Sequence, residues 1–225
     1  MSSGSSEGEN EHQKPGASSH GHTHDHDHPV FQDDDDVSDP ALIRYRAIRS
    51  LLIEKGILSA DELRAAVERM ESVGPHVGAD IVAHAWADPA FHSRLVESPK
   101  SAVAELGYHV AEADLIIVEN TPQVHNLIVC TLCSCYPRSI LGQPPAWYVS
   151  RSYRTRAVRE PRSVIAEFGL QISSDCEVRV HDSNADMRYL VLPMRPEGTD
   201  GWDRDRLSQL VTRDCLIGTA VPQAK

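Results

Sequence analysis

The chain lacks the features that mark several large classes of protein. Lysine and arginine number 22 against 33 aspartate and glutamate residues, a formal net charge of −11, so a basic nucleic-acid-binding surface is not expected. No apolar run approaches the roughly 20 residues of a membrane span, and the polar N-terminus lacks the apolar stretch of a signal peptide. We therefore expect a cytoplasmic protein with no nucleic-acid or membrane partner.

The cysteines do not form the pattern of a disulfide framework. They number 5, an odd count, in a chain without an export signal. Cys176 and Cys215 stand alone, and we expect them to be buried apolar thiols. Cys130, Cys133 and Cys135 fall within one short segment, which makes this cluster the candidate for chemistry.

The negative charge belongs to an N-terminal tail. Residues 1–40 carry ten acidic side chains and one lysine, whereas the remaining 185 residues are nearly neutral. Residues 1–37 are almost free of large apolar side chains, so we expect this tail to be disordered. Five of its histidines alternate with other residues: His20, His22, His24, His26 and His28. This composition is compatible with a metal-gathering arm, but it favours a solvated tail with no specific role.

Helix signals fill residues 38–107, which we expect to form a helical arm. Capping side chains, three of them followed by proline within two residues, mark four helix starts: Ser38, Ser59, Asp88 and Ser98. Glu62 completes a capping box with Ser59, and Gly56 and Gly107 mark helix ends.

Strand-length runs dominate the rest of the chain. Short β-branched segments bounded by turn residues lie at 115–118, 127–129, 178–180 and 189–192. Leu216–Ala220 is predicted as a last strand, and one helix is predicted between Glu160 and Gly169. Helices first and strands later, without regular alternation, indicate an α+β fold, with residues 108–225 as a second domain around the cysteine cluster.

The cluster, Cys130-Thr131-Leu132-Cys133-Ser134-Cys135, has the spacing CxxCxC. A zinc site needs four ligands, usually from a second cysteine pair that this chain lacks. Iron–sulfur spacings do not match, and a thioredoxin-like CxxC needs no third cysteine. Three cysteines in so short a segment are poorly explained as buried apolar residues.

A single ion held in one tight loop suits this spacing better. Only one residue separates Cys133 from Cys135, so both sulfurs can bind one ion only if the backbone wraps closely around it. The main-chain nitrogens of Ser134 and Cys135 then come within reach. Three thiolates and two deprotonated amides would leave one position open on a trivalent ion, as a hydration catalyst requires.

The cluster resembles the metal-binding motif of nitrile hydratase α subunits and of the related thiocyanate hydrolase γ subunit. The similarity covers residues 40–222 and includes six flanking segments: 119–122, 141–148, 159–162, 188–193, 195–199 and 212–214. The resemblance implies a helical N-terminal arm followed by a four-layer α-β-β-α domain. This agrees with the helix-then-strand pattern.

The resemblance also implies a metal and its ligands. One cobalt(III) per chain would be bound by Cys130, Cys133, Cys135 and the main-chain nitrogens of Ser134 and Cys135. Thr131 points to cobalt, since iron-containing members carry serine there. Cys133 would be oxidised to sulfinate and Cys135 to sulfenate. Cys133, Ser134 and Cys135 would form the catalytic group, in which the metal polarises the nitrile or acidifies water and the sulfenate acts as base or nucleophile.

Three further residues match a family triad that braces the site: Asp182, Asp186, which departs from the usual glutamate, and Arg188. Surface salt bridges are the alternative role for all three. The resemblance implies a hetero-oligomer with β-type subunits, which supply arginines to the oxidised sulfurs, and a cobalt-insertion activator protein.

The substrate is less well determined by the sequence. Arg138 stands where nitrile hydratases commonly carry tryptophan, and it resembles the thiocyanate hydrolase sequence, where a cation would suit an anionic substrate. In contrast, residues 107–129 are compact, as in nitrile hydratases, and residues 110–113 lack the family's pocket glutamine, which would leave room for a bulky or heteroaromatic nitrile. We expect nitrile hydration to the amide. The alternatives are conversion of thiocyanate to carbonyl sulfide and ammonia and, more distantly, a non-catalytic cobalt-binding protein.

Overall fold

The computed structural model describes residues 40–112 and 114–224. The predicted disordered tail, its alternating histidines and the Ser38 helix cap lie outside the described residues. Among the described helices, none has the length and apolarity to cross a membrane.

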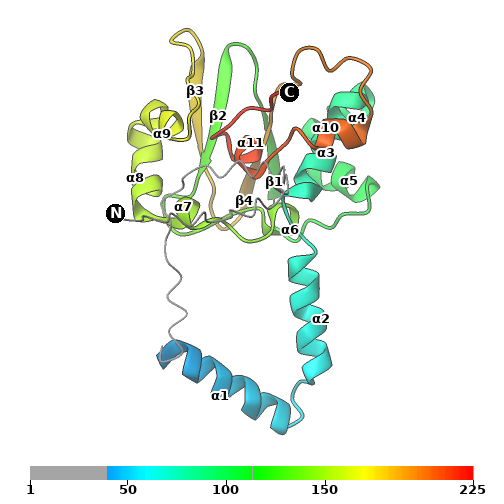
Figure 1. Ribbon diagram of the computed structural model, residues 1–225, viewed down its shortest axis with the longest axis vertical. Coiled ribbons are helices and arrows are strands. Elements are labelled where there is room, and N and C mark those ends of the chain that lie inside the picture. The colour runs from blue at the N-terminus through cyan, green and yellow to red at the C-terminus, as the bar shows by residue number, and fades with distance from the viewer. Residues whose placement is uncertain (1–39, 113, 225) are drawn as a thin grey trace, which may run out of the picture. The chain divides into compact units, whose positions relative to one another are not determined.

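The described part of the chain begins with five helices (Figure 1): α1 Pro40–Glu54, α2 Ala60–Glu71, α3 Pro75–Ala87, α4 Pro89–Glu97 and α5 Pro99–Glu105. The capping box predicted for α2 is confirmed, since the Glu62 amide donates to Ser59 Oγ over 3.1 Å and the Ser59 amide to Glu62 Oε2 over 2.7 Å. Asp88 caps α4 through the Ala90 amide. The capping rules therefore locate the starts of these two helices correctly.

Within residues 40–112 and 114–224, four strands form two parallel pairs. β1 (Asp114–Glu119) pairs with β4 (Met187–Leu192), and β2 (Val124–Val129) pairs with β3 (Glu177–Asp182). Short connections join β1 to β2 and β3 to β4, so each hairpin-like unit contributes one strand to each sheet. The register of the second pair places Val129 opposite Asp182. The segment that follows β2 therefore begins beside the end of β3.

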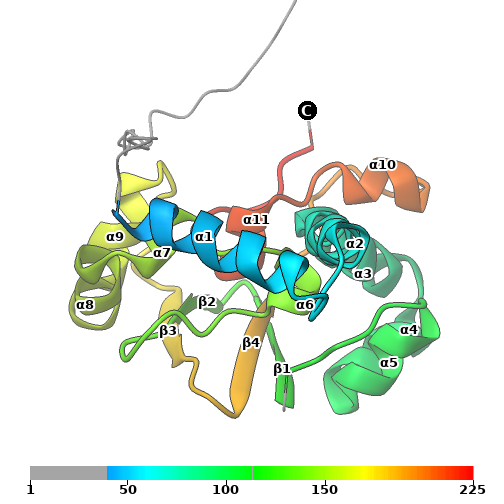
Figure 2. The ribbon, with the colours of Figure 1, turned by 90° about the horizontal axis from the view of Figure 1, so that it is seen from below.

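The sheets lie between two layers of helices, as Figure 2 shows. Helices α4 and α5 pack on β1, whereas α8 (Arg151–Arg159) packs on β2 and α9 (Pro161–Glu167) on β3. The remaining helices are short: α6 Arg138–Leu141, α7 Ala146–Val149, α10 Arg204–Ser208 and α11 Arg213–Ile217. Leu127 and Val191, from different sheets, are fully buried in the shared core. The predicted α-β-β-α order of layers is confirmed.

The exposure of the N-terminal helices is uneven. No residue of α1 is buried, and Tyr45 and Ile48 are more than half exposed. In contrast, Ile81 of α3 and Val103 of α5 are fully buried in the same core as the strands. The division of the chain at residue 107 stays a prediction.

The predicted last strand, Leu216–Ala220, is wrong. Cys215, Leu216 and Ile217 belong to helix α11 and pack against β2 and β4. The Thr212 side chain caps this helix by accepting from the Cys215 amide, and Gly218 ends it at φ +92°. A short buried apolar run is compatible with a strand or a helix, and here the cap and the glycine decide for the helix.

Candidate metal centre

The cysteine loop, Cys130–Cys135, follows β2 directly and brings its three sulfurs together. The Cys130 and Cys133 sulfurs lie 3.5 Å apart, and the Cys133 and Cys135 sulfurs 3.1 Å apart. All three lie within 4.8 Å of one another. Cys130 is fully buried, Cys135 is partly exposed and Cys133 is exposed. The loop therefore presents one deep sulfur and two sulfurs nearer the surface.

The backbone of the loop turns toward these sulfurs. The Cys133 amide donates to Cys130 Sγ over 3.3 Å. The Ser134 and Cys135 amides hydrogen-bond the Cys133 sulfur and help to lower its pKa. Clustered thiols and inward-facing amides in one loop are a donor set suited to a soft or borderline transition metal. The residues present thus fit the metal that the sequence predicts.

The Cys133 and Cys135 thiols differ in acidity. Hydrogen bonds from the Cys135 and Cys130 side chains are the main cause that lowers the pKa of Cys133 to about 7. Burial, followed by its hydrogen bond with Cys133, raises the pKa of Cys135 to about 12, and the nearby charge of Arg188 opposes this rise. Cys133 therefore forms a thiolate more readily than Cys135, and a metal that takes all three sulfurs must displace protons.

Side chains from α7 and α8 hold the loop from outside. The Tyr148 hydroxyl donates to the Cys135 carbonyl over 2.8 Å, and Arg154 Nη1 donates to the Cys133 carbonyl over 3.0 Å. Sequence reasoning gave neither residue a role, although Tyr148 lies in a segment that resembles the family. Residue spacing carries no signal for such contacts, because they depend on how α7 and α8 pack.

The predicted triad is only partly assembled around the loop. Asp182 accepts from the Thr131 amide over 2.9 Å and from the Thr131 hydroxyl over 2.6 Å. Arg188 donates to the Met187 carbonyl over 3.3 Å, and its side chain faces the same pocket as the cysteines. The Asp186 side chain is exposed, and no hydrogen bond of its carboxylate is found within the described chain. Asp182 contacts the loop and Arg188 lines its pocket, whereas no such contact of Asp186 is found within the described chain, so its bracing role stays a prediction.

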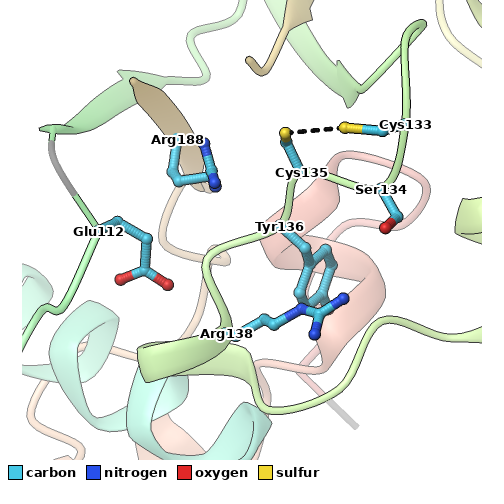
Figure 3. A pocket seen from close by; sticks show the side chains of 7 residues that line it. All are labelled: Glu112, Cys133, Ser134, Cys135, Tyr136, Arg138 and Arg188. Carbon is cyan, nitrogen blue, oxygen red and sulfur yellow. Dashed lines mark hydrogen bonds between the residues drawn. The ribbon is translucent and has the colours of Figure 1, made fainter. Parts of the chain in front are cut away.

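A pocket of about 260 Å³ opens beside the loop (Figure 3). It is lined by Glu112, Cys133, Ser134, Cys135, Tyr136, Arg138 and Arg188. Arg138 therefore lies where the sequence predicts a pocket residue. The Glu112 carboxylate accepts from the Ser139 amide over 3.0 Å and from the Ser139 hydroxyl. Residues 110–113 thus place an anionic side chain, Glu112, on the pocket wall, and the room that they would leave for a bulky nitrile stays a prediction.

The two isolated cysteines differ from each other. Cys215 is buried, as predicted, and burial raises the pKa of its thiol. Cys176 is partly exposed, which contradicts the prediction of a buried thiol. It lies in the segment just before β3.

The comparisons with known proteins agree with one another on the family. Residues 39–220 match the family described as nitrile hydratase, alpha chain. The low-molecular weight cobalt-containing nitrile hydratase subunit alpha of Rhodococcus rhodochrous is 48% identical over 185 residues, which cover 80% of this chain and 87% of the relative. The cobalt-containing nitrile hydratase subunit alpha of Pseudonocardia thermophila is 44% identical over 196 residues, with 86% and 96% covered. Thiocyanate hydrolase subunit gamma of Thiobacillus thioparus is 45% identical over 201 residues, with 84% and 82% covered.

Solved structures agree with these relatives. A recombinant thiocyanate hydrolase comprising partially modified cobalt centres superposes with a TM-score of 0.76 at 45% identity, covering 82% of this chain and 90% of its own. A double mutant of the Fe-type nitrile hydratase from Comamonas testosteroni Ni1 superposes with a TM-score of 0.76 at 38% identity, covering 83% and 93%. Sequence, fold and cysteine loop thus point the same way: the chain belongs to the nitrile hydratase α-chain family.

Proposed function

We propose that this chain is the metal-binding catalytic subunit of a cobalt nitrile hydratase, which hydrates a nitrile to the amide. The observation that carries the proposal is that the three cysteine sulfurs lie together in a loop beside the pocket. Three sulfurs lie within 4.8 Å of one another, and two of their cysteines line the same pocket. The relatives named as cobalt-containing nitrile hydratase subunits support the choice of metal and reaction.

The ligands proposed for one cobalt(III) are the sulfurs of Cys130, Cys133 and Cys135 and the main-chain nitrogens of Ser134 and Cys135. A bound cobalt(III) supplies a Lewis acid that activates a nitrile or a water molecule. Cys133 as sulfinate and Cys135 as sulfenate are the oxidised forms expected of metal-activated thiolates that solvent reaches at least in part. Cys135, on the pocket wall that it shares with Cys133 and Ser134, would act as the base that takes a proton from water or as the nucleophile.

The surrounding side chains set the geometry of this wall. Asp182 fixes Thr131 at the start of the loop through two hydrogen bonds, so we assign it a bracing role. Arg188 places a positive charge near Cys135, where it stabilises an anionic sulfur. Arg138 and Glu112 lie on the pocket wall with opposite charges, so they are proposed to select the substrate.

The chain is proposed to work in a hetero-oligomer with β-type subunits, after loading by a cobalt-insertion activator. The exposed surface supports a partner at the loop, since Leu132 is 82% exposed beside the exposed Cys133 and a large apolar side chain at that position favours a covering surface. A reducing cytoplasm suits the chain, because the loop thiols must be free to take up metal.

The decisive assay uses the chain co-expressed with its β-type partner in cobalt-supplemented cells. Amide formation from a nitrile, without carbonyl sulfide from thiocyanate, supports the proposal. Carbonyl sulfide without amide formation assigns the chain to thiocyanate hydrolysis, the alternative that Arg138 in the pocket favours. A complex that holds cobalt and converts neither compound is a cobalt-binding protein. Cys135→Ala serves as the inactive control.

A further inference from the structure

We infer that Arg154 is a positioning residue for the metal-binding backbone. It aligns the peptide bond between Cys133 and Ser134 and balances the negative charge that this peptide carries when its nitrogen binds the metal. The inference rests on the proposed function, because it concerns the peptide bond between Cys133 and Ser134. Arg154 Nη1 donates to the carbonyl oxygen of that peptide over 3.0 Å. The nitrogen of the same peptide belongs to Ser134, one of the proposed main-chain ligands.

An amide nitrogen that binds a metal does so after losing its proton to solvent. The resulting negative charge is shared between the nitrogen and the carbonyl oxygen, because the peptide bond is conjugated. A cation that donates a hydrogen bond to the oxygen therefore stabilises the metal-bound form more than the neutral peptide. Arg154 is a cationic donor at the Cys133 oxygen.

Helix α8 holds Arg154 in place with respect to the loop. Ser150 caps the helix by accepting from the Tyr153 amide over 3.1 Å. Tyr153 is buried, and its hydroxyl donates over 2.6 Å to the carbonyl of Ile128, two residues before the loop begins. These contacts fix the first turn of α8 against the end of β2. The Arg154 side chain therefore loses little conformational entropy when its guanidinium donates to the Cys133 carbonyl.

The surroundings of Arg154 favour a strong charge interaction. Its Nε atom is buried and has no hydrogen-bond partner within the described chain, so water screens this side of the guanidinium poorly. Arg151, one turn earlier on α8, is exposed. The two arginines therefore form a matched pair, of which only Arg154 touches the loop.

The test measures cobalt uptake in the full chain co-expressed with its partner, over a series of cobalt concentrations in the growth medium. For Arg154→Gln, the cobalt concentration that gives half occupancy is expected to rise about tenfold or more, as for loss of a hydrogen bond to a charged group. Arg154→Lys should fall between Arg154→Gln and the wild type, since it keeps the charge but loses the planar fork. Arg151→Gln should match the wild type.

A spectroscopic readout separates this role from a merely structural one. The sulfur-to-cobalt charge-transfer absorption of the loaded protein should shift in Arg154→Gln, partly recover in Arg154→Lys and stay unchanged in Arg151→Gln. Wild-type uptake and absorption in Arg154→Gln would overturn the inference while leaving the proposed function intact. Failure of the wild type to hold cobalt defeats the proposed function itself. If Arg154→Gln does not fold, Arg154→Lys carries the test, and half occupancy at the wild-type concentration overturns the inference.

Discussion

Single residues around the pocket carry a mixture of charges that composition does not reveal. Arg138, Arg188 and Glu112 all line the pocket, and Ser139 holds the Glu112 carboxylate through its amide and hydroxyl. Arg138 is predicted at the pocket from its resemblance to the thiocyanate hydrolase sequence at that place. Glu112 is twenty-three residues from Cys135 in the chain, so its position depends on tertiary packing.

Neutralising Glu112 should shift the pocket toward anions. In Glu112→Gln, the affinity for thiocyanate as substrate or inhibitor is expected to rise roughly several-fold, since two arginines remain without an opposing charge. Inhibition of nitrile hydration by thiocyanate measures the effect. Glu97→Gln removes the same charge from an exposed site on α4 and should leave inhibition unchanged. Equal inhibition of both variants would contradict the assignment of Glu112 to the pocket wall.

Asp182 and Asp186 should differ sharply although both match the family triad. Asp182→Asn disturbs two hydrogen bonds to Thr131, and outer-sphere losses of this kind cost about tenfold or more in metal binding or activity. The Asp186 carboxylate makes no hydrogen bond within the described chain, so Asp186→Asn should be nearly neutral. The cobalt content and the hydration rate of the two purified complexes measure the difference between the variants. A loss in Asp186→Asn as large as that in Asp182→Asn is the opposite result.

At the scale of helices and strands, the sequence predicted those features that depend on residues close together in the chain. The Ser59 capping box and the Asp88 cap form because their partners lie within three residues. Strand existence was predictable from β-branched runs, but the parallel pairing of β2 with β3 was not, because a strand's composition does not name its partner. The error at Leu216–Ala220 arose because a buried apolar run satisfies both a strand and a helix. The contacts of Tyr148 and Arg154 with the loop likewise depend on helix packing.

Gly218, which ends α11, should tolerate no side chain. A Cβ atom there would overlap with the Asn126 carbonyl oxygen, at a backbone φ of +92°. Gly218→Ala is therefore expected to lower the free energy of unfolding by roughly 3 kcal/mol or more, as overpacking adds to backbone strain. Gly198 has φ +75° with nothing within 4 Å of an added Cβ, so Gly198→Ala should cost only about 1 kcal/mol. Urea unfolding of the cobalt-free chain measures the free energy of unfolding of both variants. Similar losses in Gly218→Ala and Gly198→Ala would refute the predicted contact.

For the whole molecule, a buried polar network links the two sheets. His125 Nε2 donates to the Gly218 carbonyl over 2.7 Å, and the Asn126 side-chain amide donates to the Glu119 carbonyl over 2.7 Å. His181 Nε2 donates to Asn126 Oδ1 over 2.8 Å. Burial lowers the pKa of both histidines. The network ties β1, β2 and β3 to the end of α11, so its protonation state affects global stability.

The chain should therefore lose stability on mild acidification. The folded-state pKa of His125 lies below its ordinary value of 6.5, so the unfolded chain binds the proton more readily. Stability is full above about pH 6.5 and is lost as the pH falls from there through the lowered folded-state pKa. His125→Gln should be less stable at pH 8 but show a flatter decline, whereas His109→Gln, at an exposed position, should follow the wild type. Thermal midpoints at successive pH values measure this, and an unchanged slope in His125→Gln contradicts it.

The central claim is that one loop of this chain, with three sulfurs and two main-chain nitrogens, holds a trivalent cobalt ion and carries oxidised cysteines. Metal analysis combined with peptide mass measurement on the purified complex tests it most directly. We expect one cobalt per chain, with two added oxygen atoms on Cys133 and one on Cys135. Zinc in place of cobalt, or a loop without metal and with unmodified cysteines in the assembled complex, would contradict it.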